Sequence, residues 1–169
     1  MTTPTTAATG VDPVVPVDPV VLAFLHREAR LADEARYSEW EQLWDDEARY
    51  WVPMSENADP ERDLSYIYDN RRRLRSRVAQ LNTGSRHSQT PPSKMRRLLT
   101  NTELLDRDSD TVTVGSNFVL YEYRYGMTTW AGRVIHRIVL DPERGPRLRE
   151  KTVHLVNAGD PLPTLAFLL

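Results

Sequence analysis

Apolar residues recur at helical spacing early in the chain, and Asp18 and Pro19 open the pattern. Aspartate is a favoured N-cap residue and proline is favoured at the first helical position, so a helix is predicted to begin there. Glu28 lies within its apolar stripe, either at the flank or as a carboxylate paired with an arginine, and a catalytic acid is the sharper alternative. The stripe consists of Val21, Phe24, Leu25, Leu31, Ala32 and Ala35.

A second apolar seam predicts a long helix from about Leu64 to Leu81. Its positions alternate spacings of three and four residues, as on one face of a helix. They are Leu64, Ile67, Arg71, Leu74, Val78 and Leu81. Arg71 is the cation of this seam, so its guanidinium is expected to need a carboxylate or carbonyl partner. The arginines around it lie mostly off the seam, and they are interpreted as solvated or paired side chains rather than as a nucleic-acid patch.

The stretch from residue 34 to residue 55 carries three of the four tryptophans of the chain. Ser38 and Glu41 have the spacing of a capping box, which predicts the start of a short helix. The aromatic and β-branched residues at 50–52 favour a strand. One helical face is expected to hold Trp40, Leu43 and Trp44. So much aromatic surface requires burial, and we expect the other elements to pack around it.

Alternating apolar positions separated by turn residues predict four strands in the second half of the chain. These strands are Met95–Leu105, Thr111–Tyr125, Thr128–Leu140 and Leu148–Asn157. The parity of the apolar positions changes along the second of them, so a bulge is expected near Gly115. Helices followed by a run of antiparallel strands indicate the α+β class, with the helices segregated to one side of a curved sheet.

The two ends of the chain differ in composition. Residues 1–17 are rich in threonine, proline and alanine without periodicity, which predicts a flexible N-terminal arm. Residues 18–169 are then expected to form a single domain. The final segment, TLAFLL, is too short to span a membrane and too apolar for a free tail. It is expected to pack against the sheet or against a partner subunit.

Composition narrows the possible chemistry. The formal net charge of -2 argues against a chain whose main partner is a polyanion. The sequence has no cysteine, which excludes disulfides, thiolate catalysis and thiolate metal ligands. No apolar run approaches about 18 residues, and the N-terminus lacks the layout of a secretory signal. We therefore expect a cytoplasmic protein.

Several segments together resemble the small (β) subunit of Rieske-type aromatic-ring-hydroxylating dioxygenases, from about Leu22 onward. They are EARLADEARYSEWEQLWDDEARYWVPMSE, YIYDNRRRLRSRVAQLNTG, PPSKMRRLLTNTELL and SNFVLYEYRY. The resemblance implies the conical α+β barrel of the nuclear transport factor 2-like superfamily. In that fold a curved, mostly antiparallel sheet has N-terminal helices packed in and over it. The ending, RLREKTVHLVNAGDPLPTLAFLL, looks more like the branch that acts on aromatic carboxylic acids.

The resemblance also implies a structural subunit that has no catalytic, metal or cofactor-binding residues of its own. In that family the large (α) subunit holds a [2Fe–2S] Rieske cluster and a mononuclear Fe(II), and it performs the cis-dihydroxylation used in aromatic compound degradation. Three small subunits form a trimeric base in a hetero-hexamer of three α and three β. The four histidines here lack metal-ligand spacing on one element: His26, His87, His136 and His154. The candidates for subunit contacts are Arg71, Lys94, Arg96, Arg97, Leu165, Phe167, Leu168 and the loop 82–93.

A second hypothesis is a stand-alone dehydratase, isomerase or cyclase of the same cone fold. Such enzymes place a carboxylate, histidine or tyrosine in an apolar pocket. His136 shares the apolar face of its predicted strand, either as a core or pocket-wall histidine or as a general base. The pocket candidates under this hypothesis are Tyr37, Asp45, Tyr50 and His136. A binding or scaffolding module with an empty cone is the third alternative.

Overall fold

The computed structural model describes residues 15–83 and 91–169. The described elements are α1 (Pro19–Asp33), α2 (Tyr37–Glu41), β1 (Trp44–Pro53), β2 (Ser65–Asn70), α3 (Arg71–Asn82), β3 (Lys94–Arg107), β4 (Thr111–Tyr123), β5 (Met127–Asp141) and β6 (Gly145–Leu155). Of the arm predicted over residues 1–17, only residues 15–17 are described, and Val17 is already buried in the core. Most of the predicted loop 82–93, with His87, also lies outside the described residues.

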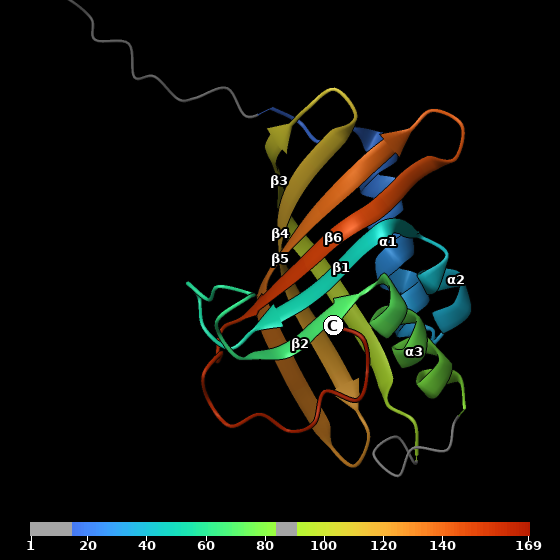
Figure 1. The fold of residues 1–169 in the computed structure, drawn as a ribbon. Helices are drawn as coiled ribbons and strands as arrows, with labels where there is room; N and C mark the ends of the chain where they lie inside the picture. The colour runs from blue at the N-terminus through green and yellow to red at the C-terminus, as the bar shows by residue number, and fades with distance from the viewer. Residues whose placement is uncertain (1–14, 84–90) are drawn as a thin grey trace, which may run out of the picture.

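The six described strands form one sheet in the order β2-β1-β6-β5-β4-β3. Strands β3 to β6 follow one another as an antiparallel meander, and β1 joins β6 in parallel. Figure 1 shows the sheet curving, with the three helices gathered on one side of it. The predicted α+β class is confirmed, and the sheet remains open because β2 and β3 are its two edges.

The aromatic stretch lies at the centre of the core, as predicted. Trp40, Trp44 and Tyr50 are fully buried, and their ring centroids lie 5.2 to 6.1 Å apart. The local structure differs from the predicted capping box, because α2 begins at Tyr37 and its N-cap residue makes no side-chain cap bond. Trp44 begins strand β1 instead of ending a helical face, since the backbone pairs there with β6.

The predicted helix over residues 64–81 is correct only in its second half. A strand, β2, precedes α3 and pairs with β1, and Leu64 is 80% exposed. The aromatic and β-branched residues of β2 favour a strand. This preference prevails over the helical spacing, which Ile67 also fits. The helix starts at Arg71 because the side chain of Asn70 accepts a hydrogen bond from the backbone N–H of Arg73.

The four predicted strands of the second half are confirmed to within a few residues at each end. The bulge expected near Gly115 is wrong for β4, which pairs with β5 without a register shift from Thr111 to Tyr123. The irregularity lies on β3 instead, where Asn101 has a φ of 50°. The apparent change of parity arose because β4 carries apolar residues on both faces.

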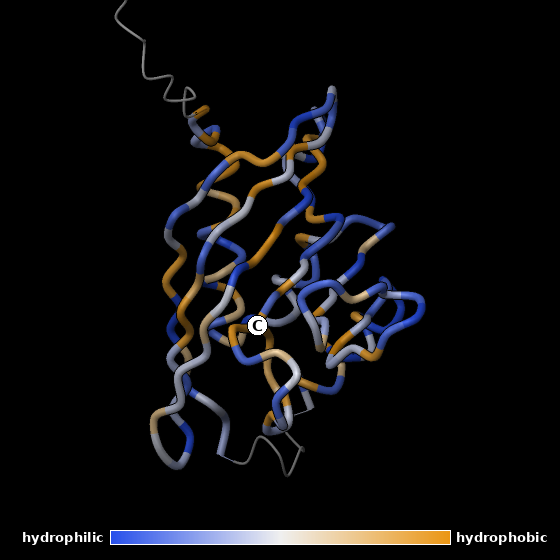
Figure 2. Tube along the Cα trace, turned by 90° about the vertical axis from the view of Figure 1, so that its left-hand side faces the viewer, coloured by the Kyte–Doolittle hydropathy of each residue, from blue (hydrophilic) through white to orange (hydrophobic). Residues whose placement is uncertain are grey.

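The apolar end of the chain packs inside the molecule. Ala166 to Leu169 are buried, and the ring of Phe167 lies 5.5 Å from that of Trp130 on β5. In both views the last residues, which carry the C label, lie in the middle of the molecule (Figure 1, Figure 2). The TLAFLL segment was expected to pack either against the sheet or against a partner subunit. In the structure it packs against the sheet of its own chain.

Candidate functional site

The interior of the curved sheet holds a cluster of buried ionisable side chains. Lys151 Nζ lies 2.7 Å from Glu28 Oε1, and both side chains are 2% exposed. The indole N–H of Trp40 donates to the same carboxylate oxygen at 2.6 Å. His136 Nε2 lies 3.9 Å from Glu28 Oε2. The carboxylate of α1 is thus contacted from α2, β5 and β6.

Local register explains why these residues meet. Glu28 lies on the buried stripe of α1, and His136 pairs directly with Lys151 across β5 and β6. Lys151 alternates with Val153 on the inward face of β6, so its side chain must point into the core. Lys151 was not predicted as a buried charge from the sequence, although this alternation was the available signal. Glu28 therefore pairs with a lysine, and not with the arginine that the sequence suggested.

The pKa values follow from burial and from these contacts. Burial alone would raise the pKa of Glu28, but Lys151, His136 and Arg97 lower it to about 2. Burial lowers the pKa of His136 to about 3, so the imidazole is neutral at neutral pH. Burial also lowers the pKa of Lys151, and the carboxylate of Glu28 opposes that change. With so low a pKa, His136 is a poor general base at neutral pH.

The C-terminal segment closes this interior. The hydroxyl of Tyr50 accepts from the backbone N–H of Leu169 at 2.9 Å and donates to its carbonyl at 3.4 Å. Arg97 Nη2 donates to the carbonyl of Leu168 at 2.8 Å, while its Nε donates to Asp33 at 2.7 Å. The cavity left beside Glu28, His136 and Lys151 measures about 10 Å³. That volume holds about one water molecule.

The residues expected in an enzyme pocket do not converge on this cavity. His136 lines it, but Tyr37, Asp45 and Tyr50 do not. Tyr50 is buried in the aromatic core and held by Leu169. Asp45 forms an ion pair with Arg149 at 3.6 Å, and Tyr37 is half-buried on α2, where burial raises its pKa.

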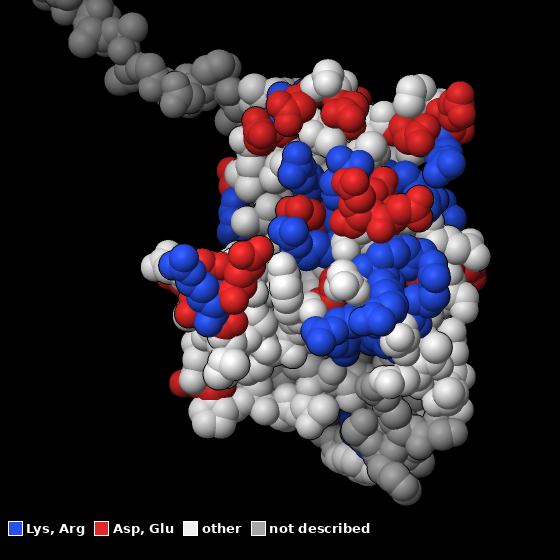
Figure 3. Space-filling view, in the orientation of Figure 1, with Lys and Arg blue, Asp and Glu red and all other residues white. Residues whose placement is uncertain are grey.

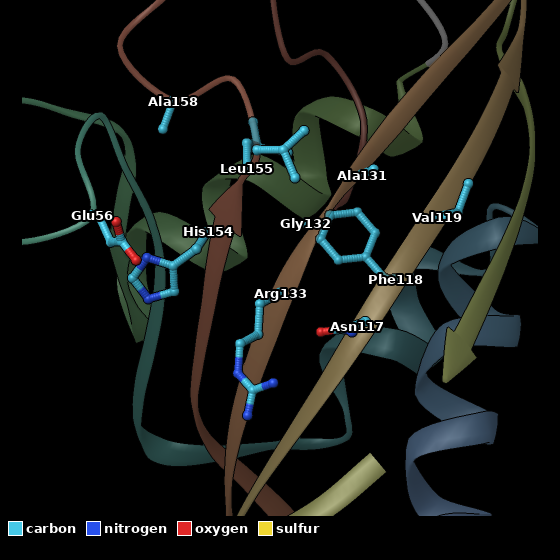
Figure 4. Close-up of a pocket in the computed structure, with 11 residues that line it drawn as sticks. Glu56, Asn117, Phe118, Val119, Ala131, Gly132, Arg133, His154, Leu155 and Ala158 are labelled. Carbon is cyan, nitrogen blue, oxygen red and sulfur yellow. The ribbon is translucent and has the colours of Figure 1, made fainter. Parts of the chain in front are cut away.

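A second hollow lies on the outer side of the sheet (Figure 4). This groove of about 580 Å³ has Phe118 and Gly132 among its lining, with Glu56, Arg133 and His154 as polar members. Figure 4 shows Glu56 and His154 side by side at one wall. A Cβ at Gly132 would lie 2.0 Å from the carbonyl oxygen of His154, so only glycine fits where these strands meet. Burial lowers the pKa of His154.

The predicted subunit-contact residues divide into exposed and internal ones. Lys94 and Arg96 are exposed on β3. Arg71 binds Glu41 at 2.9 Å, which confirms that it needs a carboxylate partner and places that partner in the same chain. Leu165 is half-buried. The side chains of Arg97, Phe167 and Leu168 lie in the chain's own core, because Arg97 binds Asp33 and Leu168. These three side chains therefore contact their own chain, and their role in subunit contacts stays a prediction.

Two further findings concern the described residues alone. Within residues 15–83 and 91–169, no group of three or more histidine, cysteine, aspartate or glutamate side chains is placed to hold a metal ion. None of the helices in the same ranges is long and apolar enough to cross a membrane.

Comparison with known proteins gives consistent results. Residues 27–159 match the family model of the ring hydroxylating beta subunit. The chain is 33% identical over 111 residues to the 2-halobenzoate 1,2-dioxygenase small subunit of Burkholderia cepacia, an alignment that covers 62% of this chain and 67% of that protein.

Solved structures give the same result at the level of the fold. The beta subunit of the benzoate 1,2-dioxygenase from Burkholderia mallei superposes with a TM-score of 0.75 and 26% identity, covering 91% of this chain and 99% of that one. An NTF2-like protein with a cystatin-like fold from Novosphingobium aromaticivorans matches with a TM-score of 0.54 and 14% identity, covering 81% and 80%. The second match shows the fold alone, and it agrees with the cone fold expected from the sequence.

Proposed function

Because the chain belongs to the ring hydroxylating beta subunit family, we propose that it is the structural, non-catalytic β subunit of a multicomponent aromatic-ring-hydroxylating dioxygenase in the cytoplasm. It supports the assembly of large α subunits that hold the Rieske [2Fe–2S] cluster and the mononuclear Fe(II). Three copies of each chain form a hetero-hexamer. The substrate is an aromatic acid, since two relatives are named for benzoate and 2-halobenzoate.

The closed interior is the observation that carries the non-catalytic role. A cone-fold enzyme needs a pocket for its substrate, and such pockets measure several hundred Å³. Here the last residues of the chain fill that space and leave about 10 Å³. The available metal ligands also support the non-catalytic role, because a chain without cysteine has no thiolate ligand for a Rieske cluster.

Among the proposed subunit-contact residues, Arg71, Lys94, Arg96 and Leu165 are at least partly exposed. Lys94 and Arg96 extend into solvent from β3. Arg71 retains a 20% exposed side chain while it binds Glu41, so it is available at the rim of a contact. Rim charges act mainly on association rate and orientation.

Purification of the tagged chain from its source cells tests the proposal. The expected product is a red-brown complex that contains a larger iron protein and that, when a reductant supplies electrons, consumes oxygen with an aromatic acid. The isolated chain should bind no iron and consume no oxygen. A colourless preparation of this chain alone that turns over a small carbonyl compound would instead support the stand-alone enzyme.

A variant of the buried histidine sharpens this test. The complex assembled with His136→Gln should keep its turnover per iron, because the proposed role gives this chain no part in the chemical steps. If His136 were a general base, the same substitution would lower the turnover of the complex, typically by about 100-fold or more. Recovery of intact complex serves as the control for folding of the variant.

A further inference from the structure

The outer side of the β3–β4–β5 meander carries large apolar side chains that are exposed to solvent. Strand register places them in rows: Tyr121 lies between Arg96 and Thr129, and Tyr123 lies between Lys94 and Met127. Directly paired residues point to the same side of a sheet. We call this surface the tyrosine face, and it consists of Lys94, Arg96, Leu98, Tyr121, Tyr123 and Met127.

The composition of the tyrosine face is that of an interface core. Its four apolar members are between 43% and 65% exposed. Monomeric proteins rarely leave such side chains together in solvent. Tyrosine, methionine and arginine are the residue types enriched where proteins bind each other. A groove of about 630 Å³ adjoins the face. It is lined in part by Tyr121, Tyr123 and Met127, and Asp33 and Glu34 also line it.

The charged members of the tyrosine face, Lys94 and Arg96, are both cations, and a surface of opposite charge exists on the same chain. The loop that joins β1 to β2, residues 54–64, carries four carboxylates against the single cation Arg62: Glu56, Asp59, Glu61 and Asp63. We call it the acidic loop. Figure 3 shows carboxylates gathered on this projecting loop at the left-hand edge of the molecule. It borders the outer groove through Glu56.

The topology separates these two surfaces. The tyrosine face lies on β3, β4 and β5, and β3 is one edge of the sheet. The acidic loop joins the two strands at the other edge. Two complementary patches at different places on one chain make a heterologous, head-to-tail contact, and such contacts close into rings when the rotation allows.

We propose that the tyrosine face of one copy docks against the acidic loop of the next, and that three such contacts close the ring of small subunits. This inference rests on the proposed function for the number of copies. The occupant of the tyrosine face is a second copy of this chain because its own acidic loop supplies the opposite charge. Burial of the tyrosines supplies the affinity, and the charges set the orientation.

A charge-swap experiment tests the contact in the purified chain. The first variant combines Lys94→Glu with Arg96→Glu, and the second combines Glu56→Lys with Glu61→Lys. Each should weaken self-association at least about 100-fold, because like charges then face each other. The variant that carries all four substitutions should associate as the unsubstituted chain does. Sedimentation velocity over a dilution series gives the measurement.

The matched control changes net charge equally elsewhere. Arg72→Glu with Arg144→Glu alters two exposed arginines on α3 and on the β5–β6 turn, and it should leave the trimer unchanged. The proposal is overturned if the four-fold variant stays monomeric or if either swap leaves the trimer intact. It is also overturned if the unsubstituted chain is monomeric and the swaps weaken only its binding to the large subunit. Because the isolated chain is measured, this result is independent of whether an iron-containing partner is found.

Discussion

The interior cluster and the tyrosine face both combine cations with aromatic rings. The interior cluster affects the folding equilibrium, whereas the tyrosine face affects the binding equilibrium. In the interior, Lys151 is 2% exposed and is fixed at 2.7 Å from a carboxylate. On the tyrosine face, Lys94 and Tyr123 face solvent on a regular strand pair. A buried charge must be paired for the chain to fold, whereas an exposed one changes only what binds there.

In the described part of the chain, the interior of the cone is filled and leaves a cavity of about 10 Å³ beside Glu28. The same interior chemistry, a carboxylate beside an imidazole, would suit catalysis if a substrate could enter. Here the guanidinium of Arg97 donates a hydrogen bond to the backbone carbonyl of Leu168, and the hydroxyl of Tyr50 accepts one from the backbone N–H of Leu169. The interior groups therefore contribute to the stability of the fold.

The largest effect is expected from removing the buried carboxylate. Glu28→Gln keeps the shape but leaves the ammonium of Lys151 without its counter-charge. Breaking a buried ion pair costs about 3–5 kcal/mol. The free energy of unfolding, measured by chemical denaturation, should fall by that amount.

A double variant separates charge from packing at this site. Glu28→Gln combined with Lys151→Met removes both charges, and replacing a buried pair by neutral side chains is often close to neutral. It should recover at least half of the lost free energy of unfolding. A loss below about 1 kcal/mol in the single variant would contradict the ionised pair.

Acidification should produce the next largest effect. The pKa of His136 is about 3 in the folded chain against an ordinary value of 6.5, so below pH 6.5 the unfolded chain binds a proton that the folded chain does not. The free energy of unfolding should therefore decrease as the pH falls from 6.5 toward 3. Each such proton contributes at most about 1.4 kcal/mol per pH unit, so the loss between pH 6.5 and 4.5 is of the order of 2 kcal/mol.

Glu28 adds to the same trend at lower pH. Its folded pKa is about 2 against 4.5, so its contribution is present above pH 4.5 and is lost as the pH falls toward 2. His136→Gln should flatten the curve between pH 6.5 and 4.5. His154→Gln, at the half-buried histidine of the outer groove, should retain most of the slope. Equal slopes in the unsubstituted chain and the His136 variant would rule out the histidine as the cause.

The length of each secondary-structure element largely determined whether it could be predicted from the sequence. The strands β3 to β6 were predictable because each runs over 11 to 15 residues rich in strand formers and is bounded by turn residues, even though β4 carries apolar residues on both faces. Strand β2 was missed because it has only six residues and leads directly into α3. Over so short a run, Ile67 fits a helical seam as well as it fits a strand.

The partner of a buried charge was less accessible to sequence analysis. The position of Glu28 within an apolar stripe predicted either a place at the flank or a pair with an arginine. Its partner, Lys151, lies 123 residues away, and no local spacing links the two. For Arg71 and Glu41, 30 residues apart, the need was predictable and the identity was not. Similarly, the composition of TLAFLL predicted burial without indicating that its backbone would close the interior.

The smallest effect on the fold is expected at the tyrosine face. Tyr121→Thr keeps a good strand former between Arg96 and Thr129, so the free energy of unfolding of the dilute chain should change by less than about 0.5 kcal/mol. Self-association stabilises a folded chain by mass action, so the melting temperature of the unsubstituted protein should rise with protein concentration. In the variant this concentration dependence should largely disappear, while the melting temperature at high dilution stays the same. If the dilute variant is as destabilised as Glu28→Gln, then Tyr121 belongs to the monomer's core, and the contrast between the two regions fails.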